Sequence, residues 1–212
     1  MTAPGATMGT MASARTPYPE AARELLRQTL FGAARDRLEQ QAWSEITMSD
    51  IAATAGVSRQ TLYKEFGSRD EFAQAFVIHV GERFLDDVDA AVREHLDDPR
   101  AAIDAALGMF LRAAGEDPVV RVLLSDDGTG GMLPFVTTQG MPVVVFATAR
   151  LFETIRDGWP EAPPDKVQLL AESLVRLAIS YITAPGDAPD RTAARAGELL
   201  GPFIDRALGV AG

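Results

Sequence analysis

Helix-start signals recur along this chain and leave little room for strands. Asp98-Pro99 and Asp117-Pro118 each place an acidic residue before a proline, and Thr47 stands three residues before Asp50. Such caps accept hydrogen bonds from the free N–H groups of a first helical turn, and proline is tolerated at the first helical position. Apolar residues follow these signals at helical rather than alternating spacing. The sequence therefore predicts an all-α protein.

The same signals predict where the helices begin and end. We expect a long first helix over residues 19–41, with Trp43 continuing its apolar face, and then helices that begin after Thr47, Ser58 and Ser68. Longer helices are expected at 69–97 with a break near Gly81, and at 99–115, 118–125, 136–158, 165–184 and 189–208. A glycine-rich loop should join residues 126–133. Residues 1–17, rich in Ala, Gly, Thr and Pro, predict a disordered tail.

Charge is distributed unevenly along the chain. The net charge is −10, from 20 basic and 30 acidic residues, but residues 1–70 hold 8 of each and are neutral. Residues 71–212 carry the other 12 basic and 22 acidic residues, so the whole surplus lies there. This asymmetry indicates a binding head that spans residues 18–70 and an acidic body that spans residues 71–212.

Composition excludes several classes of protein. The chain has no cysteine, so it can form neither disulfides nor thiolate metal sites. No apolar run approaches the roughly 20 residues that span a bilayer, and the N-terminus lacks a secretory signal pattern. We therefore expect a cytoplasmic protein without a membrane partner.

The stretch from Thr47 to Phe72 carries the most information about function and reads TMSDIAATAGVSRQTLYKEFGSRDEF. It predicts two short helices joined at Gly56, because glycine accepts the positive φ angle that such a turn needs. Apolar residues are spaced to form a small core between the helices, and these are Ile51, Ala52, Val57, Leu62 and Phe66. The pattern is that of a helix-turn-helix, whose second helix fits the DNA major groove.

The free face of the second helix carries side chains suited to DNA. Arginine pairs with guanine and glutamine with adenine, threonine suits either a base or a phosphate, and tyrosine and lysine suit phosphate oxygens. The candidate DNA-binding residues are Thr47, Ser58, Arg59, Gln60, Thr61, Tyr63 and Lys64. This cationic face favours DNA binding over a helix-turn-helix that serves only for packing.

Residues 25–75 resemble the head of the TetR family of transcriptional regulators. The resemblance rests on the Thr-capped helix with Ile51-Ala52, on Ala55-Gly56-Val57-Ser58, on Leu62-Tyr63 and Phe66, and on the capped Ser68-Arg69-Asp70. The sequence departs from the family pattern at Ala42, Ile46, Gln60 and Glu65. We expect Glu65 to add local repulsion from DNA and assign it no contact. The departures bear on the operator sequence rather than on DNA binding.

The resemblance implies a three-helix helix-turn-helix head and a C-terminal helical bundle that binds a ligand. It also implies operator DNA as partner, repression as the mode of regulation, and a homodimer formed through the last two long helices. Apolar residues on several sides of 165–184 and 193–208 fit burial against both a core and a partner. Packing within a monomer would give a similar pattern.

The middle of the body is rich in large apolar side chains, and residues 132–148 contain no charge. Such a region fits a small apolar effector, such as a fatty-acyl compound, better than a sugar or nucleotide. The candidate ligand-binding residues are Phe84, Met109, Phe110, Phe135, Phe146 and Phe152. For any single one of them an ordinary core position is the better interpretation, and only the concentration of such residues in this region points to a ligand.

Two other classes of function stay open. One is a DNA-binding regulator that ignores small molecules, and the other is an enzyme on a helical scaffold. We identify no catalytic residue, metal ligand or cofactor site: His79 and His95 are the only histidines. The glycines of the 126–131 segment lack the Gly-Lys-Ser/Thr ending of a phosphate-binding loop.

Overall fold

The computed structural model describes residues 18–125 and 131–209, and these ranges contain helices and no strand. The predicted all-α fold is therefore confirmed. The helices are α1 Tyr18–Leu38, α2 Met48–Thr54, α3 Arg59–Phe66, α4 Arg69–Arg93, α5 Pro99–Glu116, α6 Pro118–Leu124, α7 Met141–Gly158, α8 Pro164–Thr183 and α9 Pro189–Leu208. Short 3-10 turns lie at Trp43–Glu45 and Leu133–Phe135. The expected N-terminal tail and part of the expected 126–133 loop lie outside the described residues.

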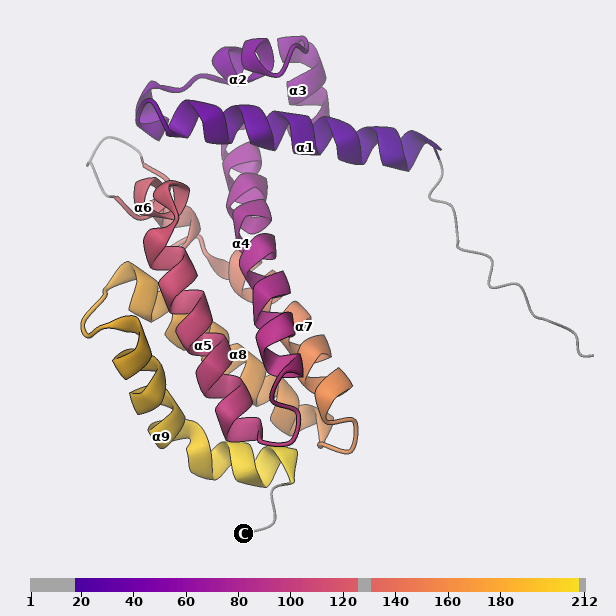
Figure 1. Cartoon of the computed structure of the whole chain (residues 1–212). Helices are drawn as coiled ribbons and strands as arrows, with labels where there is room; N and C mark the ends of the chain where they lie inside the picture. Colours follow the sequence, from indigo (N-terminus) through magenta and orange to yellow (C-terminus); the bar gives the residue numbers. More distant parts are fainter. Residues whose placement is uncertain (1–17, 126–130, 210–212) are drawn as a thin grey trace, which may run out of the picture.

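The helices form a small head on an elongated body (Figure 1). Helices α1, α2 and α3 lie together at one end, and α4 runs from the head down into the body. In the body, α4 packs against both α5 and α7, α7 packs against α8, and α9 packs along α5. Helix α4 begins directly after α3, so it links the head to the bundle.

The predicted helix caps are present in the structure. The Asp98 carboxylate accepts hydrogen bonds from the N–H groups of residues 100 and 101, at 3.0 and 3.1 Å. The Asp117 carboxylate accepts one from the Val119 N–H at 2.7 Å. These contacts satisfy N–H groups that have no partner within their own helix. They explain why α5 and α6 begin where the sequence indicates.

Three expectations about the helices are wrong. Helix α4 continues through Gly81 without a break, because buried Val77, Val80 and Phe84 hold both sides of the glycine in the core. Trp43 is not on the first helix: that helix ends at Leu38, and the indole packs from a separate 3-10 turn. Helix α7 begins at Met141 instead of residue 136, since residues 133–135 form a turn of their own.

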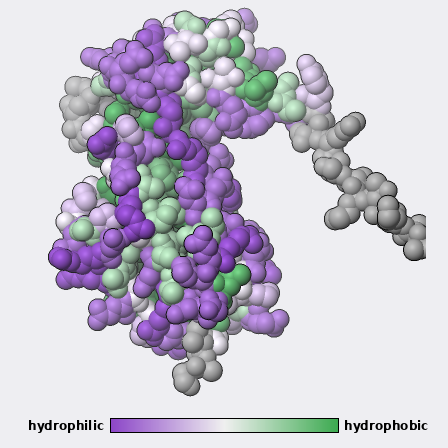
Figure 2. All heavy atoms as spheres, in the orientation of Figure 1, coloured by the Kyte–Doolittle hydropathy of each residue, from purple (hydrophilic) through white to green (hydrophobic). Residues whose placement is uncertain are grey.

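Apolar side chains fill the interior in two main clusters. One runs from α1–α3 through the upper part of α4 to α6, and the other lies among α4, α5, α7, α8 and α9. Figure 2 shows hydrophilic residues over most of one face and a narrow band of apolar residues along the middle of the body. The first cluster extends across the junction between α3 and α4, so the head rests on the body through packed side chains.

Candidate DNA-binding surface and apolar cavity

Helix α2 starts at a complete capping box. The Thr47 hydroxyl accepts from the Asp50 N–H at 3.2 Å, and the Asp50 carboxylate accepts from the Thr47 N–H at 2.9 Å. The hydrogen bond from the Thr47 hydroxyl, then that from its N–H, and the nearby Arg37 hold the pKa of Asp50 below its usual value. Thr47 is thereby fixed at the exposed start of α2.

A tight turn at Gly56 sets the angle between α2 and α3. Gly56 has a φ of 70°, which a residue with a side chain rarely adopts. The Val57 N–H donates to the Ala52 carbonyl at 3.0 Å and closes the turn. Ile51 and Leu62 are fully buried between the helices, and Phe66 is 7% exposed. The small core expected from the sequence holds the second helix in place, although Val57 is only half-buried.

Helix α3 presents a cationic and polar face. Its start is capped by the Ser58 hydroxyl, which accepts from the Thr61 N–H at 3.0 Å. The side chains of Arg59, Gln60 and Lys64 are exposed, whereas Thr61 and Tyr63 are half-buried. The Arg59 guanidinium lies 5.1 Å from the centre of the Tyr63 ring. The structure therefore brings the predicted DNA-binding residues together on α3 and at the two helix starts.

Glu65 turns away from this face toward α1. Its carboxylate accepts from Arg23 Nε at 2.8 Å and from Arg27 Nη1 at 2.9 Å, and its side chain is only 10% exposed. The Arg27 guanidinium also lies over the Phe66 ring at 4.7 Å. The charge of Glu65 is thus neutralised by two arginines, and the expected repulsion from DNA has no support in this geometry.

Arg69 is a positioning residue that the sequence analysis did not assign. Its Nη2 atom donates to the backbone carbonyls of Trp43 at 2.5 Å and Ile46 at 3.1 Å. Its guanidinium stacks over the Trp43 ring at 4.5 Å. Arg69 begins α4, and Ile46 directly precedes Thr47, so this contact connects the start of α4 with the start of α2. In the sequence, the only local indication of this role was that a basic residue follows the Ser68 cap.

The body contains an apolar cavity of about 140 Å³ between α4, α5, α6, α7 and α8. Every described residue that lines it is apolar or glycine. The lining residues are Val77, Ile78, Val80, Gly81, Phe84, Leu85, Val88, Ile103, Ala106, Leu107, Phe110, Ala114, Val120, Leu123, Leu124, Val136, Val143, Phe146, Ala147, Leu151, Leu174, Val175, Ala178, Ile179 and Ile182. A polar molecule would find few hydrogen-bond partners here, so the cavity suits an apolar guest.

Only some of the candidate ligand-binding residues reach this cavity. Phe84, Phe110 and Phe146 line it, whereas Met109, Phe135 and Phe152 are not among the lining residues. Most of the wall is made of Val, Leu, Ile and Ala, whereas the predicted ligand-binding residues were all Phe or Met. The helical spacing of residues 77, 81, 84 and 88 could have indicated the cavity wall on α4. An ordinary core face has the same spacing, so the sequence does not distinguish the two.

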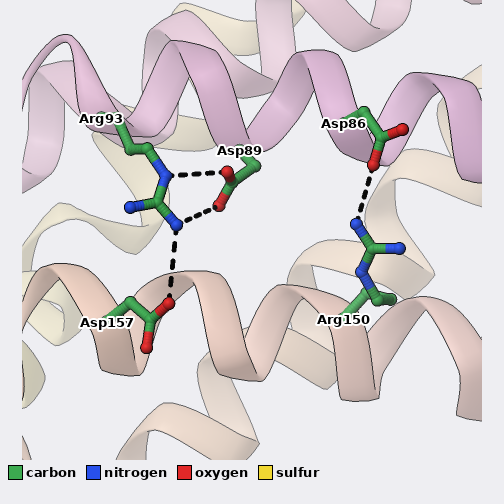
Figure 3. A network of polar contacts seen from close by, with 5 residues as sticks. All are labelled: Asp86, Asp89, Arg93, Arg150 and Asp157. Carbon is green, nitrogen blue, oxygen red and sulfur yellow. Dashed lines mark hydrogen bonds and ion pairs between the residues drawn. The ribbon is translucent and has the colours of Figure 1, made fainter. Parts of the chain in front are cut away.

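Ion pairs join α4 and α7, two of the helices that line the cavity (Figure 3). Arg150 of α7 donates to Asp86 of α4 at 2.8 Å, and Arg93 of α4 lies 3.5 Å from Asp157 of α7. Arg93 also donates to Asp89 at 2.8 Å, and this bond is the main reason why the pKa of Asp89 is lowered. Asp86 and Asp157 are therefore each paired with an arginine of the facing helix.

A helix-turn-helix head on a helical body is the arrangement of a DNA-binding transcriptional regulator, and the comparisons with known proteins identify the family. The model described as "Bacterial regulatory proteins, tetR family" matches residues 30–76. The model "Bacterial Tetracyclin repressor, C-terminal domain" matches residues 98–202. The chain belongs to the TetR family and is a DNA-binding transcriptional regulator rather than an enzyme.

Particular relatives are similar over nearly the whole chain. The HTH-type transcriptional regulator AlkX of Mycobacterium tuberculosis is 35% identical over 206 residues, which cover 97% of both chains. The regulator EthR of Mycolicibacterium smegmatis is 29% identical over 89 residues, which cover 42% of this chain and 41% of EthR.

Among solved structures, the TetR family repressor AlkX from a Dietzia strain has a TM-score of 0.76 and 32% identity. That match covers 86% of this chain and 96% of AlkX. A structure of RolR in complex with resorcinol has a TM-score of 0.58 at 19% identity, covering 89% of this chain and 95% of RolR, which supports the fold alone. None of the described helices is long and apolar enough to cross a membrane.

Proposed function

We propose that this regulator is a homodimeric repressor, and that an apolar molecule entering the cavity among α4, α5, α6, α7 and α8 releases it from operator DNA. The observation that carries this proposal is the apolar lining of the cavity, because one wall of it is α4. Only two residues, Gly67 and Ser68, separate the end of α3 from the start of α4. A guest that displaces α4 therefore changes the position of the helix that carries Arg59, Gln60 and Lys64.

Specific residues on the head take different roles in this proposal. Arg59 and Gln60 stand in the first turn of α3, where side chains approach base edges in a helix-turn-helix complex. Thr47, Ser58, Tyr63 and Lys64 contact phosphate oxygens, and Thr61 supports Ser58 through their hydroxyl contact at 2.8 Å. Residues 18–70 carry 7 basic and 8 acidic residues, so the head has a net charge of −1 and the cations on α3 have to act locally.

The outer faces of α8 and α9 are the proposed dimer contact. Leu169 on α8 is 52% exposed and Leu199 on α9 is 71% exposed, although both are large apolar residues. Burial of such side chains against a second copy removes apolar surface from water. Two copies would present two α3 helices to successive major grooves, about 34–36 Å apart. Release then requires only that the guest favours another separation of the heads.

The relatives support the mode of regulation and the kind of guest. The Dietzia AlkX is described as a repressor implicated in biodegradation of n-alkanes. An alkyl chain, such as that of a fatty-acyl compound, fits the apolar lining described above, whereas a sugar would lose its hydrogen bonds to water.

Coupling between such a guest and DNA typically amounts to about 1–3 kcal/mol, or roughly 5–150-fold in DNA affinity. We also expect a cytoplasmic location, where the operator is reached.

The DNA-binding roles can be tested by a mobility shift with DNA from around the native gene. Arg59→Ala should reduce discrimination between specific and unrelated duplexes. Lys64→Ala should weaken binding to all duplexes alike and reduce the salt dependence by about one phosphate contact. Arg156→Ala is the control, since it removes an exposed cation on α7, outside the head and outside the proposed dimer contact. Parental binding by both head variants would contradict the assignment of α3.

The role of the cavity can be tested by titrating saturated fatty acids and n-alkanes into the protein–DNA complex. Release by long-chain compounds, with no release by glucose, is the expected result. DNA affinity that stays constant across all apolar compounds would favour a regulator that does not respond to small molecules.

A further inference from the structure

Gly81 occupies a central place in the wall that α4 contributes to the cavity. The residues one turn before and after it, Val77 and Leu85, line the cavity, as does Val88 two turns later. Residues spaced by three or four share one face of a helix. Gly81 therefore lies in the middle of the cavity-facing side of α4.

Neither common structural reason for a glycine applies at this position. Gly81 is not among the glycines of the described chain with positive φ, which are Gly56, Gly67 and Gly209. No neighbouring helix approaches it closely, because a Cβ atom added to Gly81 would meet no heavy atom within 4 Å other than those of its adjacent residues and its own helix backbone. Glycine is also among the weakest helix formers, yet α4 is continuous through it. What the missing side chain provides is open space.

We propose that Gly81 is a specificity-determining residue, which keeps the middle of the cavity open for an extended apolar chain. This inference rests on the proposed ligand function and names the position that sets the size of the guest. A larger residue at position 81 would project between Phe84 and Val77 into the space that the guest needs. Ligands with shorter or thinner apolar parts would then be preferred.

The size of the effect follows from the burial of methylene groups. Each buried methylene contributes enough transfer free energy to change affinity by about fourfold. Gly81→Leu adds four carbon atoms to the wall, so it should displace two or more methylenes of a long chain. We expect the affinity for the longest well-bound fatty acid to fall by at least about tenfold, and the preferred chain length to become shorter. Gly81→Ala should give a smaller change in the same direction.

The experiment compares the full-length parent with Gly81→Ala, Gly81→Val and Gly81→Leu. Affinities are measured for saturated fatty acids of increasing chain length, by displacement of a fluorescent fatty acid, and operator affinity is measured without ligand. Gly32→Ala is the matched control. Gly32 also lies inside a helix, a Cβ atom there would meet nothing within 4 Å, and it does not line the cavity. The control separates improved helix formation from loss of cavity space.

A second measurement does not depend on the identity of the natural ligand. Xenon enters apolar cavities, and its uptake can be followed by NMR. Gly81→Leu should take up less xenon than the parent, whereas Gly32→Ala should match the parent. If the parent binds no fatty acid but Gly81→Leu loses xenon uptake, the fatty-acyl form of the proposed function fails and the role of Gly81 stands.

Two results would overturn the inference. One is Gly81→Leu with the parental chain-length preference and parental xenon uptake. The other is a Gly81→Ala variant that releases DNA less readily while binding every fatty acid as the parent does. That outcome would assign the glycine to bending of α4 instead of ligand selection. If circular dichroism shows that Gly81→Leu does not fold, Gly81→Ala takes its place, because alanine improves helix formation. Its chain-length preference and its xenon uptake then decide whether Gly81 selects the ligand.

Discussion

Replacing Glu65 with alanine tests whether the head is held together by the ion pairs between α1 and α3. The variant removes the shared acceptor of Arg23 and Arg27. A charge-assisted hydrogen bond contributes about 1.5–3 kcal/mol when buried, and an exposed ion pair about 0–1 kcal/mol. Arg27 is 30% exposed and Arg23 is 63% exposed. We take about 1–1.5 kcal/mol for the contact with Arg27 and a few tenths of a kcal/mol for the contact with Arg23. The free energy of unfolding should therefore fall by about 1–2 kcal/mol.

Thermal unfolding followed by circular dichroism measures this loss. For a chain of this size, 1 kcal/mol corresponds to a shift of about 2–4 °C, so the midpoint should fall by about 2–8 °C. All variants must be compared at one protein concentration, because assembly changes the apparent stability. Arg27→Ala should cost more than Arg23→Ala, since Arg27 also stacks on the Phe66 ring. Glu39→Ala, at an exposed position just after α1, is the control.

The opposite result has a clear meaning. If Glu65→Ala unfolds at the parental temperature and binds every duplex more tightly, the carboxylate faces DNA and repels it. The ion pairs with α1 would then contribute nothing to the stability of the head, and the geometry described for Glu65 would be wrong.

Four further predictions concern stability and pH. Thr47→Ala should destabilise the protein by about 1 kcal/mol through loss of the cap on α2, measured by urea unfolding. The pKa of Asp50 is lowered, mainly by the hydrogen bond from the Thr47 hydroxyl, so its stabilising contribution is present above the ordinary aspartate pKa and is lost as the pH falls through its folded value. An Asp50→Asn variant that follows the parental acid unfolding curve would refute this. Arg150→Ala should change the unfolding temperature little, since its partner Asp86 is 70% exposed, and a large loss would show that the pair clamps α4 to α7. Burial raises the pKa of Asp104 on α5, so Asp104→Asn should stabilise the protein at neutral pH, with the gain disappearing below the ordinary aspartate pKa, and equal melting of both proteins at pH 7 would count against it.

Local patterns predicted the elements of this protein well. The starts of α5 and α6 follow from Asp98 and Asp117, whose side chains reach N–H groups only two or three residues ahead. The turn at Gly56 and the small core of the helix-turn-helix also depend on residues close together in the sequence. Trp43 was placed on the wrong element because its apolar spacing matches α1, while the chain leaves the helix after Leu38.

Contacts between distant segments could not be predicted in this way. Glu65 has the sequence position of a residue that faces DNA, but two arginines 38 and 42 residues away turn it toward α1. Met109 and Phe152 have the chemistry of ligand-binding residues, yet other residues of the same helices, such as Phe110 and Leu151, line the cavity. A side chain's type does not say which side of its helix faces the cavity.

The sequence by itself determined the all-α fold and the helix-turn-helix, because caps, turns and helical spacing act over a few residues. Tertiary structure alone decided where the cavity lies, since five helices between residues 77 and 182 have to meet to enclose it. It also decided what Gly81 does. In the sequence a glycine inside a helix indicates a break, whereas in the packed body the neighbours of Gly81 keep the helix intact and its missing side chain leaves open space.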